Sequence, residues 1–424
     1  MLETNFLRTR RTEAIERLAK RHIDAEALVD RALALDDARR GAQTGMDALL
    51  QELNGLSRSI GELMKAGKKE EAETAKARST DLKARSQALK EQMDDAEQAL
   101  HDHLCTIPNA PNDKVPAGRT PEENVVVVQE GALPELPAQA KPHWELGEEY
   151  GILRMDLGVK VTGAGFPVYL GQGARLQRAL IAFFLDRATE TGYQEVIPPH
   201  MVNADSAFAT GQLPDKEGQM YHATADDLYL IPTAEVPITN LYRDVILDPA
   251  ALPVKLVGYT PCFRREAGSY GAHVRGLNRV HQFDKVEIVR IERPEDSYAA
   301  LEGMVEHVKG LLRALELPYR QLLLCGGDMG FASAMTYDME VWSAAQQRWL
   351  EVSSISNFET FQSNRLKLRY RGEDRKPRLA HTLNGSALAL ARIVAALLEN
   401  NQGPEGIRIP EALRPYTGFD RITK

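Results

Sequence analysis

The sequence contains few cysteines and no long apolar run. Three of its 424 residues are cysteines, Cys105, Cys262 and Cys325, and they lie far apart, without the spacing of metal ligands. This usage excludes a disulfide framework, predicts no structural zinc, and fits thiols in a reducing cytosol. No apolar stretch approaches the length of a membrane span, so we expect no membrane partner.

The chain also lacks an excess of positive charge and a secretory leader. Its formal net charge is −8, so it is not a basic, DNA-coating protein, and we expect no DNA partner. Any contact with a nucleic acid has to come from local basic clusters. The N-terminus has no hydrophobic core, and its acidic residues argue against an organelle transit helix, so we predict a cytoplasmic protein.

Proline is absent from about Glu26 to Leu104, where the chain is rich in Ala, Leu, Glu, Lys, Arg and Gln. Apolar residues alternate in steps of four and three, which predicts two seams of coiled-coil type. The first seam contains Ala42, Met46, Leu49, Leu53, Leu56, Ile60 and Leu63, and the second contains Leu82, Leu89, Met93, Ala96 and Leu100. We predict two antiparallel helices of about 35 to 40 residues, forming an arm about 55 Å long. An oligomerisation coiled coil fits the periodicity equally well.

Seven prolines between Pro108 and Pro142 interrupt regular structure after the arm, apart from a predicted short strand at Val125–Val128. We therefore place a domain boundary near Ile107. The N-terminal helical domain comprises residues 1–106 and the body comprises residues 107–424, with a linker over about 107–145.

The stretch from Leu256 to Ile291 reads as two β-strands joined by a long loop rich in Gly, Arg and His. Arg264 and Glu266 share parity on the first strand, and Phe283, Lys285 and Glu287 share parity on the second. Unpaired buried charges are costly, so these side chains indicate a charged, polar ligand. The alternative is the solvated face of an ordinary sheet.

Two further segments carry polar residues where packing favours apolar ones. Thr233 and Glu235 lie two apart in a predicted loop, where a hydroxyl and a carboxylate suit an ammonium group and a small polar side chain. Glu351 and Ser354 lie on a predicted strand and suit Mg²⁺, which takes oxygen ligands and bridges ATP phosphates. A helix cap at Glu235 and an exposed Ser-rich strand are the structural alternatives.

We predict two more helices in the body. Arg175–Thr191 is amphipathic and precedes a short strand that ends at Pro198. The second helix is predicted to open at His381–Ser386 and to run to Asn400, with Arg392 near its start.

Taken in order, these segments resemble the seryl-tRNA synthetases, a family of class II aminoacyl-tRNA synthetases. CFRREAGSYG…RGLNRVHQFDKVE is similar to motif 2, the Arg175–Thr191 helix and its strand to motif 1, and HTLNGS with Arg392 to motif 3. The resemblance spans essentially the whole chain. It implies an α+β fold: an N-terminal antiparallel two-helix coiled-coil arm, then a catalytic domain built on an antiparallel β-sheet flanked by helices.

The resemblance implies serine–tRNA ligation, in which serine and ATP form seryl-adenylate before serine passes to the 3′ end of tRNA. Arg264, Glu351 and Arg392 are the implied catalytic residues, and Glu351 and Ser354 the implied Mg²⁺ ligands. The implied ATP-binding residues are Arg264, Arg265, Glu266, Val280, Phe283, Glu351, Val352, Ser353, Ser354 and Arg392. The implied serine-binding residues are Thr233, Ala234, Glu235, Arg264, Glu287, Asn384 and Ser386.

The arm is implied to bind tRNA(Ser), and also tRNA(Sec), through Arg58, Lys65, Lys68, Lys69 and Arg78, and the chain to form a homodimer. The sequence departs from the usual family text at Ala387 and Ala391, where glycines are common, and at His273–Val274, where Asp-Thr is usual. Two other functions remain open. One is an AMP-forming ligase that loads an amino acid onto a carrier protein, and the other is a non-catalytic tRNA-binding or coiled-coil interaction protein.

Overall fold

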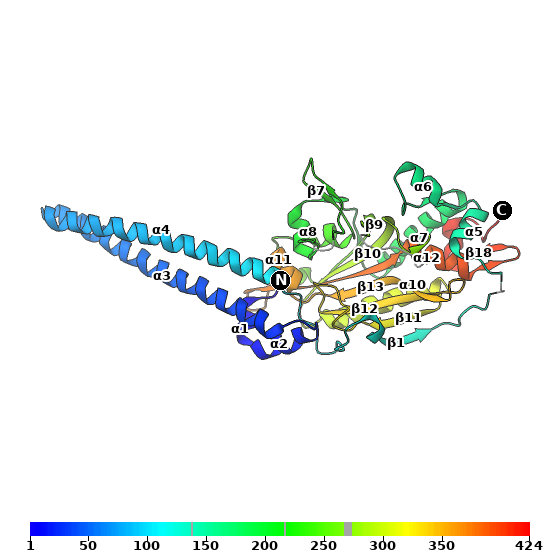
Figure 1. Ribbon diagram of the computed structural model, residues 1–424, viewed down its shortest axis with the longest axis horizontal. Coiled ribbons are helices and arrows are strands. Elements are labelled where there is room, and N and C mark those ends of the chain that lie inside the picture. Colours follow the sequence, from blue (N-terminus) through cyan, green and yellow to red (C-terminus); the bar gives the residue numbers. More distant parts are fainter. Residues whose placement is uncertain (137–138, 216–217, 267–273) are drawn as a thin grey trace. The chain divides into compact units, whose positions relative to one another are not determined.

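The computed structural model describes residues 1–136, 139–215, 218–266 and 274–424. It divides into two compact units, each described separately below. The first contains Met1–Ala19 and Ile23–Pro108, and the second contains Lys20–His22 and Asn109–Lys424 (Figure 1). In the described parts of the chain, no helix is long and apolar enough to cross a membrane.

The first unit is the predicted helical arm. Helices α3 (Ala25–Lys65) and α4 (Lys69–Thr106) run antiparallel (Figure 1), and two short helices, α1 (Thr4–Thr9) and α2 (Arg11–Ala19), pack at the base of α3. Their lengths of 41 and 38 residues correspond to about 60 Å at 1.5 Å per residue. Gly67, with φ +74°, forms the turn at the tip. The two predicted seams face each other, because Gly45 packs on Leu89 and the Ser86 hydroxyl contacts the Met46 sulfur.

The second unit is built on one eight-stranded sheet with the order β1-β11-β12-β13-β16-β10-β9-β4. Neighbouring strands are antiparallel, as predicted, except for the edge pair β4–β9, which is parallel. The strands are β1 (Val125–Glu130), β4 (Gln194–Glu195), β9 (Val254–Phe263), β10 (Gln282–Glu292), β11 (Tyr319–Leu323), β12 (Met335–Ser343), β13 (Arg348–Asn357) and β16 (His381–Ala389).

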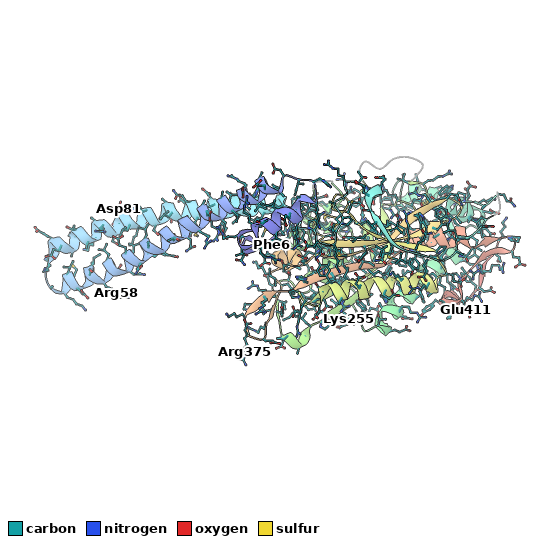
Figure 2. The ribbon with its side chains drawn as sticks, turned by 90° about the horizontal axis from the view of Figure 1, so that it is seen from below. Phe6, Arg58, Asp81, Lys255, Arg375 and Glu411 are labelled. Carbon is teal, nitrogen blue, oxygen red and sulfur yellow. The ribbon has the colours of Figure 1, made fainter. Side chains whose placement is uncertain are left out.

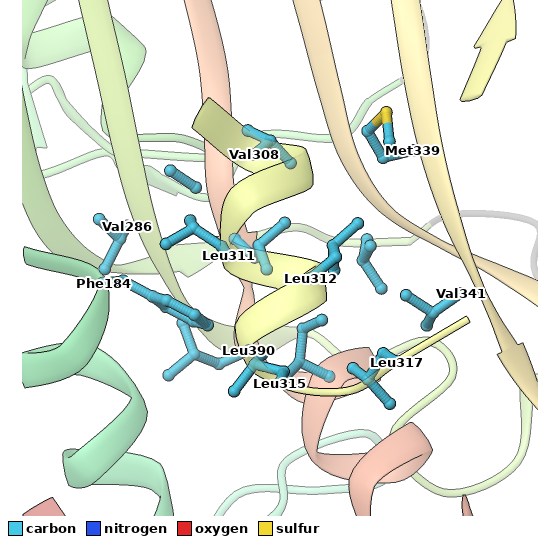
Figure 3. Packing of buried hydrophobic residues seen from close by; sticks show 14 of the residues in the cluster. Phe184, Val286, Val308, Leu311, Leu312, Leu315, Leu317, Met339, Val341 and Leu390 are labelled. Atoms are coloured by element: carbon cyan, nitrogen blue, oxygen red, sulfur yellow. The ribbon is translucent and has the colours of Figure 1, made fainter. Parts of the chain in front are cut away.

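Helices α7 (Gly171–Glu190), α10 (Ser297–Ala314) and α12 (Leu390–Asn400) pack against this sheet and form the main hydrophobic core with it. Figure 3 shows Leu312 of α10 among the packed side chains of this core, which also include Phe184 of α7 and Leu390 of α12. All three side chains are fully buried. Burial of each side chain of this size contributes about 1.5–3 kcal/mol, so the helices hold the central strands firmly in place.

Smaller elements surround the sheet. The other helices are α5 (His143–Glu149), α6 (Met155–Val161), α8 (Ala204–Thr210), α9 (Glu235–Asn240), α11 (Phe361–Leu366), α13 (Arg414–Thr417), η1 (Pro121–Glu123), η2 (Pro249–Ala251) and η4 (Glu411–Leu413). The other strands are β2 (Leu153–Arg154), β3 (Val168–Tyr169), β5 (Met201–Val202), β6 (His222–Ala223), β7 (Leu228–Leu230), β8 (Ile246–Leu247), β14 (Arg369–Arg371), β15 (Pro377–Leu379), β17 (Gln402–Gly403), β18 (Gly406–Arg408) and β19 (Arg421–Ile422).

The predicted helix from His381 to Asn400 is wrong in its first half. His381–Ala389 is the strand β16, and the helix α12 begins only at Leu390. The strand lies between β10 and β13 and is buried on both faces, so its sequence shows no alternation of apolar and polar residues. Asn384 and Ser386 are therefore strand residues in the middle of the sheet.

Two local predictions in the body also need correction. β9 ends at Phe263, so Arg264 and Glu266 lie beyond the strand, and Glu266 has a left-handed backbone (φ +48°). The sequence predicts a loop at Thr233–Glu235, but Glu235 is the first residue of α9. Strand parity therefore does not govern where these side chains point.

Candidate active site

The centre of the candidate site is one face of β10 beside β16. Phe283, Lys285 and Glu287 alternate along β10, as predicted, and Glu287 pairs in register with Ser386 of β16. The Lys285 ammonium lies 2.6 Å from the Glu287 carboxylate, and the side chains of both residues are less than one-tenth exposed. A buried ion pair of this kind needs further hydrogen bonds to offset the cost of removing both charges from water.

The neighbouring elements supply those hydrogen bonds. Lys285 donates to the Thr233 hydroxyl at 2.7 Å, and the Ser386 hydroxyl donates to Glu287 at 3.4 Å. The Thr233 hydroxyl also accepts a hydrogen bond from the backbone N–H of Glu235 at 3.2 Å. The loop before α9 and the two central strands thus meet at a single polar cluster.

Glu235 adds a second buried carboxylate to this cluster. It accepts a hydrogen bond from the Gln362 amide at 2.6 Å. Burial, followed by the nearby charge of Glu287, raises the pKa of Glu235 to about 7, although hydrogen bonds from Gln362 and Asn384 and the charge of Lys285 oppose the shift. Two carboxylates lie near one ammonium group, so the cluster has an electrostatic preference for one additional cation.

Arg264 lies beside this cluster, directly after β9. Its Nε donates to the Pro232 carbonyl at 3.3 Å, and its guanidinium carbon lies 5.3 Å from the centre of the Phe283 ring. Glu266 forms an ion pair with Arg279. Arg265 is exposed, and its backbone N–H donates to the Gln219 carbonyl at 2.8 Å. His273 lies outside the described residues, so its departure from the usual family text has no structural outcome.

A β-bulge places the predicted metal ligands on one face of β13. Opposite β12, Ser354 pairs with Asp338 and Glu351 pairs with Glu340, so Val352 is the extra residue of the bulge. Residues three apart, which would alternate in a regular strand, therefore face the same side. Burial and the charge of Glu351 raise the pKa of Asp338.

This face suits a Mg²⁺ ion held mainly by ATP phosphates and water. The side chain of Glu351 is 49% exposed, so its carboxylate is available to a bound ligand. Across the described chain, no cluster of three or more His, Cys, Asp or Glu residues forms a metal site made of protein alone. Mg²⁺ commonly binds through one or two carboxylates plus substrate oxygens, and Glu351 with Ser354 fits that pattern.

Arg392 joins this face to the loop that precedes β10. Its Nη1 donates to the Glu351 carbonyl at 2.7 Å and lies 3.8 Å from the Glu351 carboxylate, while its Nε donates to the Asn278 carbonyl at 2.9 Å. The guanidinium is therefore held on two sides before any ligand binds.

Not every predicted site residue presents its side chain to this region. Val280 and Val352 belong to the main hydrophobic core, so a contact with ATP would use their backbone atoms. Ser353 donates to the Ser386 carbonyl at 2.5 Å and links β13 to β16. Ala387 is also fully buried in the core, and Ala391 is nearly so.

The sequence alone assigns no role to several residues of the site. For Lys285, the signal available in the sequence is strand parity, which places its side chain on the same face of β10 as Glu287. Gln362 of α11 and Asn278 give no local signal, because they meet Glu235 and Arg392 through tertiary contacts alone.

Comparison with known proteins identifies the family to which the chain belongs. Residues 1–111 match the seryl-tRNA synthetase N-terminal domain, and residues 220–401 match the tRNA synthetase class II core domain (G, H, P, S and T). The chain is 52% identical to the serine–tRNA ligase of Salinibacter ruber over 424 residues, which cover 100% of this chain and 99% of that protein. The chain belongs to the seryl-tRNA synthetase family.

Other members of the seryl-tRNA synthetase family agree over the same length. The serine–tRNA ligase of Chlorobium phaeovibrioides is 46% identical, with 100% of this chain and 99% of that protein covered. The crystal structure of seryl-tRNA synthetase from Pyrococcus horikoshii complexed with ATP has a TM-score of 0.94 and 34% identity, covering 100% of this chain and 99% of that one. The predicted fold class and enzyme class, an aminoacyl-tRNA synthetase, are confirmed.

The raised pKa of Glu235 predicts a pH-dependent stability. As pH rises from about 4.5, the unfolded chain loses this proton before the folded chain does, so stability falls until the pH passes about 7. We expect Glu235→Gln to increase the free energy of unfolding of the ligand-free protein by up to about 3 kcal/mol at pH 8, with little change at pH 4.5.

Tryptophan fluorescence during denaturant unfolding measures this effect, since Trp144, Trp342 and Trp349 all lie in the second unit. The matched control is Glu411→Gln at an exposed position (Figure 2). Equal changes in the free energy of unfolding for the two substitutions at pH 8 would contradict the raised pKa of Glu235.

Proposed function

We propose that the chain activates L-serine with ATP and transfers it to the 3′ end of tRNA(Ser), with tRNA(Sec) as a second acceptor implied by the family. The serine carboxylate attacks the α-phosphorus of ATP, which gives seryl-adenylate and releases pyrophosphate. The terminal ribose 3′-OH then takes the seryl group and releases AMP. The observation that carries this proposal is the buried Lys285–Glu287–Glu235 cluster beside Arg264, because it combines an excess of buried carboxylate over ammonium with a nearby guanidinium.

Serine fits the buried cluster through its two polar ends. Its ammonium group supplies the cation that balances the second carboxylate. We assign it to Thr233 and Glu235 and to the backbone of Ala234, whose side chain is fully buried in a hydrophobic cluster. Its hydroxyl is assigned to Glu287 and Ser386, assisted by Asn384. Charge-assisted hydrogen bonds to a buried carboxylate are strong, and leaving that carboxylate unpaired is costly.

ATP is assigned to the residues around Arg264, next to the buried cluster. A guanidinium can bridge two anions, so Arg264 would bind both the α-phosphate and the serine carboxylate as charge develops between them. Phe283 and Arg392 would sandwich the adenine, with Glu266 accepting from its amino group. The stretch Glu351–Ser354 and the residues Arg265 and Val280 complete this assignment. Mg²⁺ held by Glu351 and Ser354 would neutralise phosphate charge when it is bound.

The helical unit, residues 1–106 of the predicted division, is assigned to tRNA. Arg58, labelled in Figure 2, and Lys65, Lys68, Lys69 and Arg78 are all exposed near the tip. Arg78 pairs with Glu52 and Lys68 pairs with Glu71, whereas Arg58, Lys65 and Lys69 make no ion pair within 4 Å among the described residues. These three charges are thus the most available for phosphate contacts.

A homodimer and a cytoplasmic location complete the proposal. The homodimer is implied by the family. A cytoplasmic location is supported by the three thiols, each of which is buried.

The amino acid is identified by ATP–pyrophosphate exchange screened across the twenty amino acids. We expect exchange with serine, and a kcat/KM for alanine lower by roughly 30- to 1,000-fold, since alanine leaves a buried carboxylate unpaired at a cost of about 2–4 kcal/mol. Exchange that is supported best by another amino acid, or by none, would overturn the proposed substrate.

Glu287→Ala tests the assigned reading of the serine hydroxyl. We expect the KM for serine to rise by at least about tenfold, while the KM for ATP changes by less than about twofold. Glu292→Ala is the matched control, because Glu292 lies on the same strand, is 3% exposed and is paired with Arg290. Equal losses for serine and ATP in the Glu287 variant would mean that this residue is structural.

Reversal of the three available charges tests the role of the arm. In the full chain, Arg58→Glu with Lys65→Glu and Lys69→Glu should lower kcat/KM for tRNA at least about tenfold and leave exchange unchanged. Reversal of Lys83, Arg85 and Lys90, which are also exposed on α4, is the control. Normal charging by the first variant would argue against a tRNA-binding tip, and charging of a carrier protein instead of tRNA would replace the proposed acceptor.

A further inference from the structure

A buried histidine–glutamate pair lies behind the site and takes no part in the assignments above. His143 is the first residue of α5, and Glu399 lies near the end of α12. Both side chains are fully buried, and His143 Nδ1 lies 2.7 Å from Glu399 Oε1. A fully buried pair of ionisable groups is costly unless every polar atom is satisfied, so its partners indicate what it does.

Glu399 is surrounded by donors from three elements. Its Oε1 accepts from the His143 backbone N–H at 2.9 Å and from the Gln346 amide at 2.9 Å, and its Oε2 accepts from the Ser343 hydroxyl. Burial opposes ionisation, but the hydrogen bonds from His143 and Ser343 more than offset this effect, so the pKa of Glu399 lies below its usual value. An ionised carboxylate fixes the Nδ1–H tautomer of His143.

The other ring nitrogen of His143 forms a hydrogen bond with the segment that precedes β10. Its Nε2 accepts from the Leu277 backbone N–H at 2.8 Å. Gly276, with φ +67°, packs so closely on this ring that a Cβ would lie 2.3 Å from Nε2. Arg275 stacks over Trp144 of α5 at 4.9 Å. The Arg-Gly-Leu sequence within the predicted motif 2 is therefore held in place by contacts with His143 and Trp144 of α5.

A second contact links the same pair to Arg392. Gln346 donates to Glu399 and accepts from the Asn278 amide at 2.8 Å, and the Asn278 carbonyl accepts from Arg392 Nε at 2.9 Å. Arg392 in turn donates to the Glu351 carbonyl. An unbroken chain of hydrogen bonds thus runs from the buried pair to two residues assigned to ATP.

We propose that His143 and Glu399 are positioning residues for the ATP site. His143 orders Gly276–Asn278 by accepting the Leu277 N–H at Nε2, and Gln346 with Asn278 then holds Arg392 in the orientation that receives the nucleotide. This inference rests on the proposed function, because the proposed function assigns Arg392 to ATP. A displacement of about 1 Å in such a group costs up to about 100-fold in rate.

Two substitutions at His143 separate its two hydrogen bonds. The short amide introduced by His143→Asn would reach only the Nδ1 position, so this variant keeps a donor to Glu399 and loses the acceptor for Leu277. The longer side chain in His143→Gln reaches the Nε2 position and keeps that acceptor. In serine-dependent ATP–pyrophosphate exchange, we expect His143→Asn to lower kcat/KM for ATP at least about tenfold, with the KM for serine within about twofold, and His143→Gln to stay within about threefold of the parent.

His307→Asn is the control for loss of a half-buried histidine in the same unit. His307 lies on α10 beside Tyr193, and burial lowers its pKa to about 4. We expect this variant to retain the kcat/KM for ATP and the KM for serine of the parent chain. Equal activity of the two His143 variants, or parallel losses for ATP and serine, would overturn the inference.

A milder variant covers the case in which the His143 variants do not fold. Gln346→Met breaks the link to Asn278 and leaves the His143–Glu399 contact in place, and it should raise the KM for ATP at least about threefold with little effect on serine. An unchanged KM for ATP would contradict the positioning role. Failure of the proposed function itself is distinguishable, since the parent chain would then show no serine-dependent exchange.

Discussion

A charge imbalance inside the protein dominates the candidate site. Lys285 lies between Glu287 and the Thr233 hydroxyl, and the second buried carboxylate, Glu235, has no cation of its own among the described residues. The folded chain tolerates this because rigid elements deliver hydrogen bonds from Gln362, Asn384 and Ser386. The bound ammonium group of the proposed substrate would restore the balance of charge in this cluster.

The sheet explains how such a cluster stays in place. β10 and β16 lie in its middle, covered by α7, α10 and α12, and their backbones are paired on both sides. Charged side chains on central strands have little freedom to reach water, and their geometry is preset before substrates arrive. In this family the chemistry requires alignment and charge stabilisation more than covalent help from the protein, and a rigid central sheet suits that requirement.

The polar network behind the site extends the same principle outward. α5 begins at His143, within the last residues of the predicted linker, and His143 and Trp144 contact the segment that leads into β10. In the proposed arrangement, the end of the linker would therefore help to order the ATP site.

Much of this was available from the sequence, and the failures have specific causes. Heptad spacing determined the arm, because α3 and α4 pack mainly against each other and their apolar seams repeat regularly. Strand parity determined the shared face of Phe283, Lys285 and Glu287, since β10 pairs with β9 without a register shift where they lie, and the irregularity opposite Lys285 and Glu287 is in the pairing with β16. Tertiary structure decided the rest. β16 is buried on both faces and shows no period, a bulge at Val352 aligns Glu351 with Ser354, and Gln362, Asn278 and His143 reach the site from distant parts of the chain. Local patterns record which face of an element is covered, but they cannot record which distant side chain covers it.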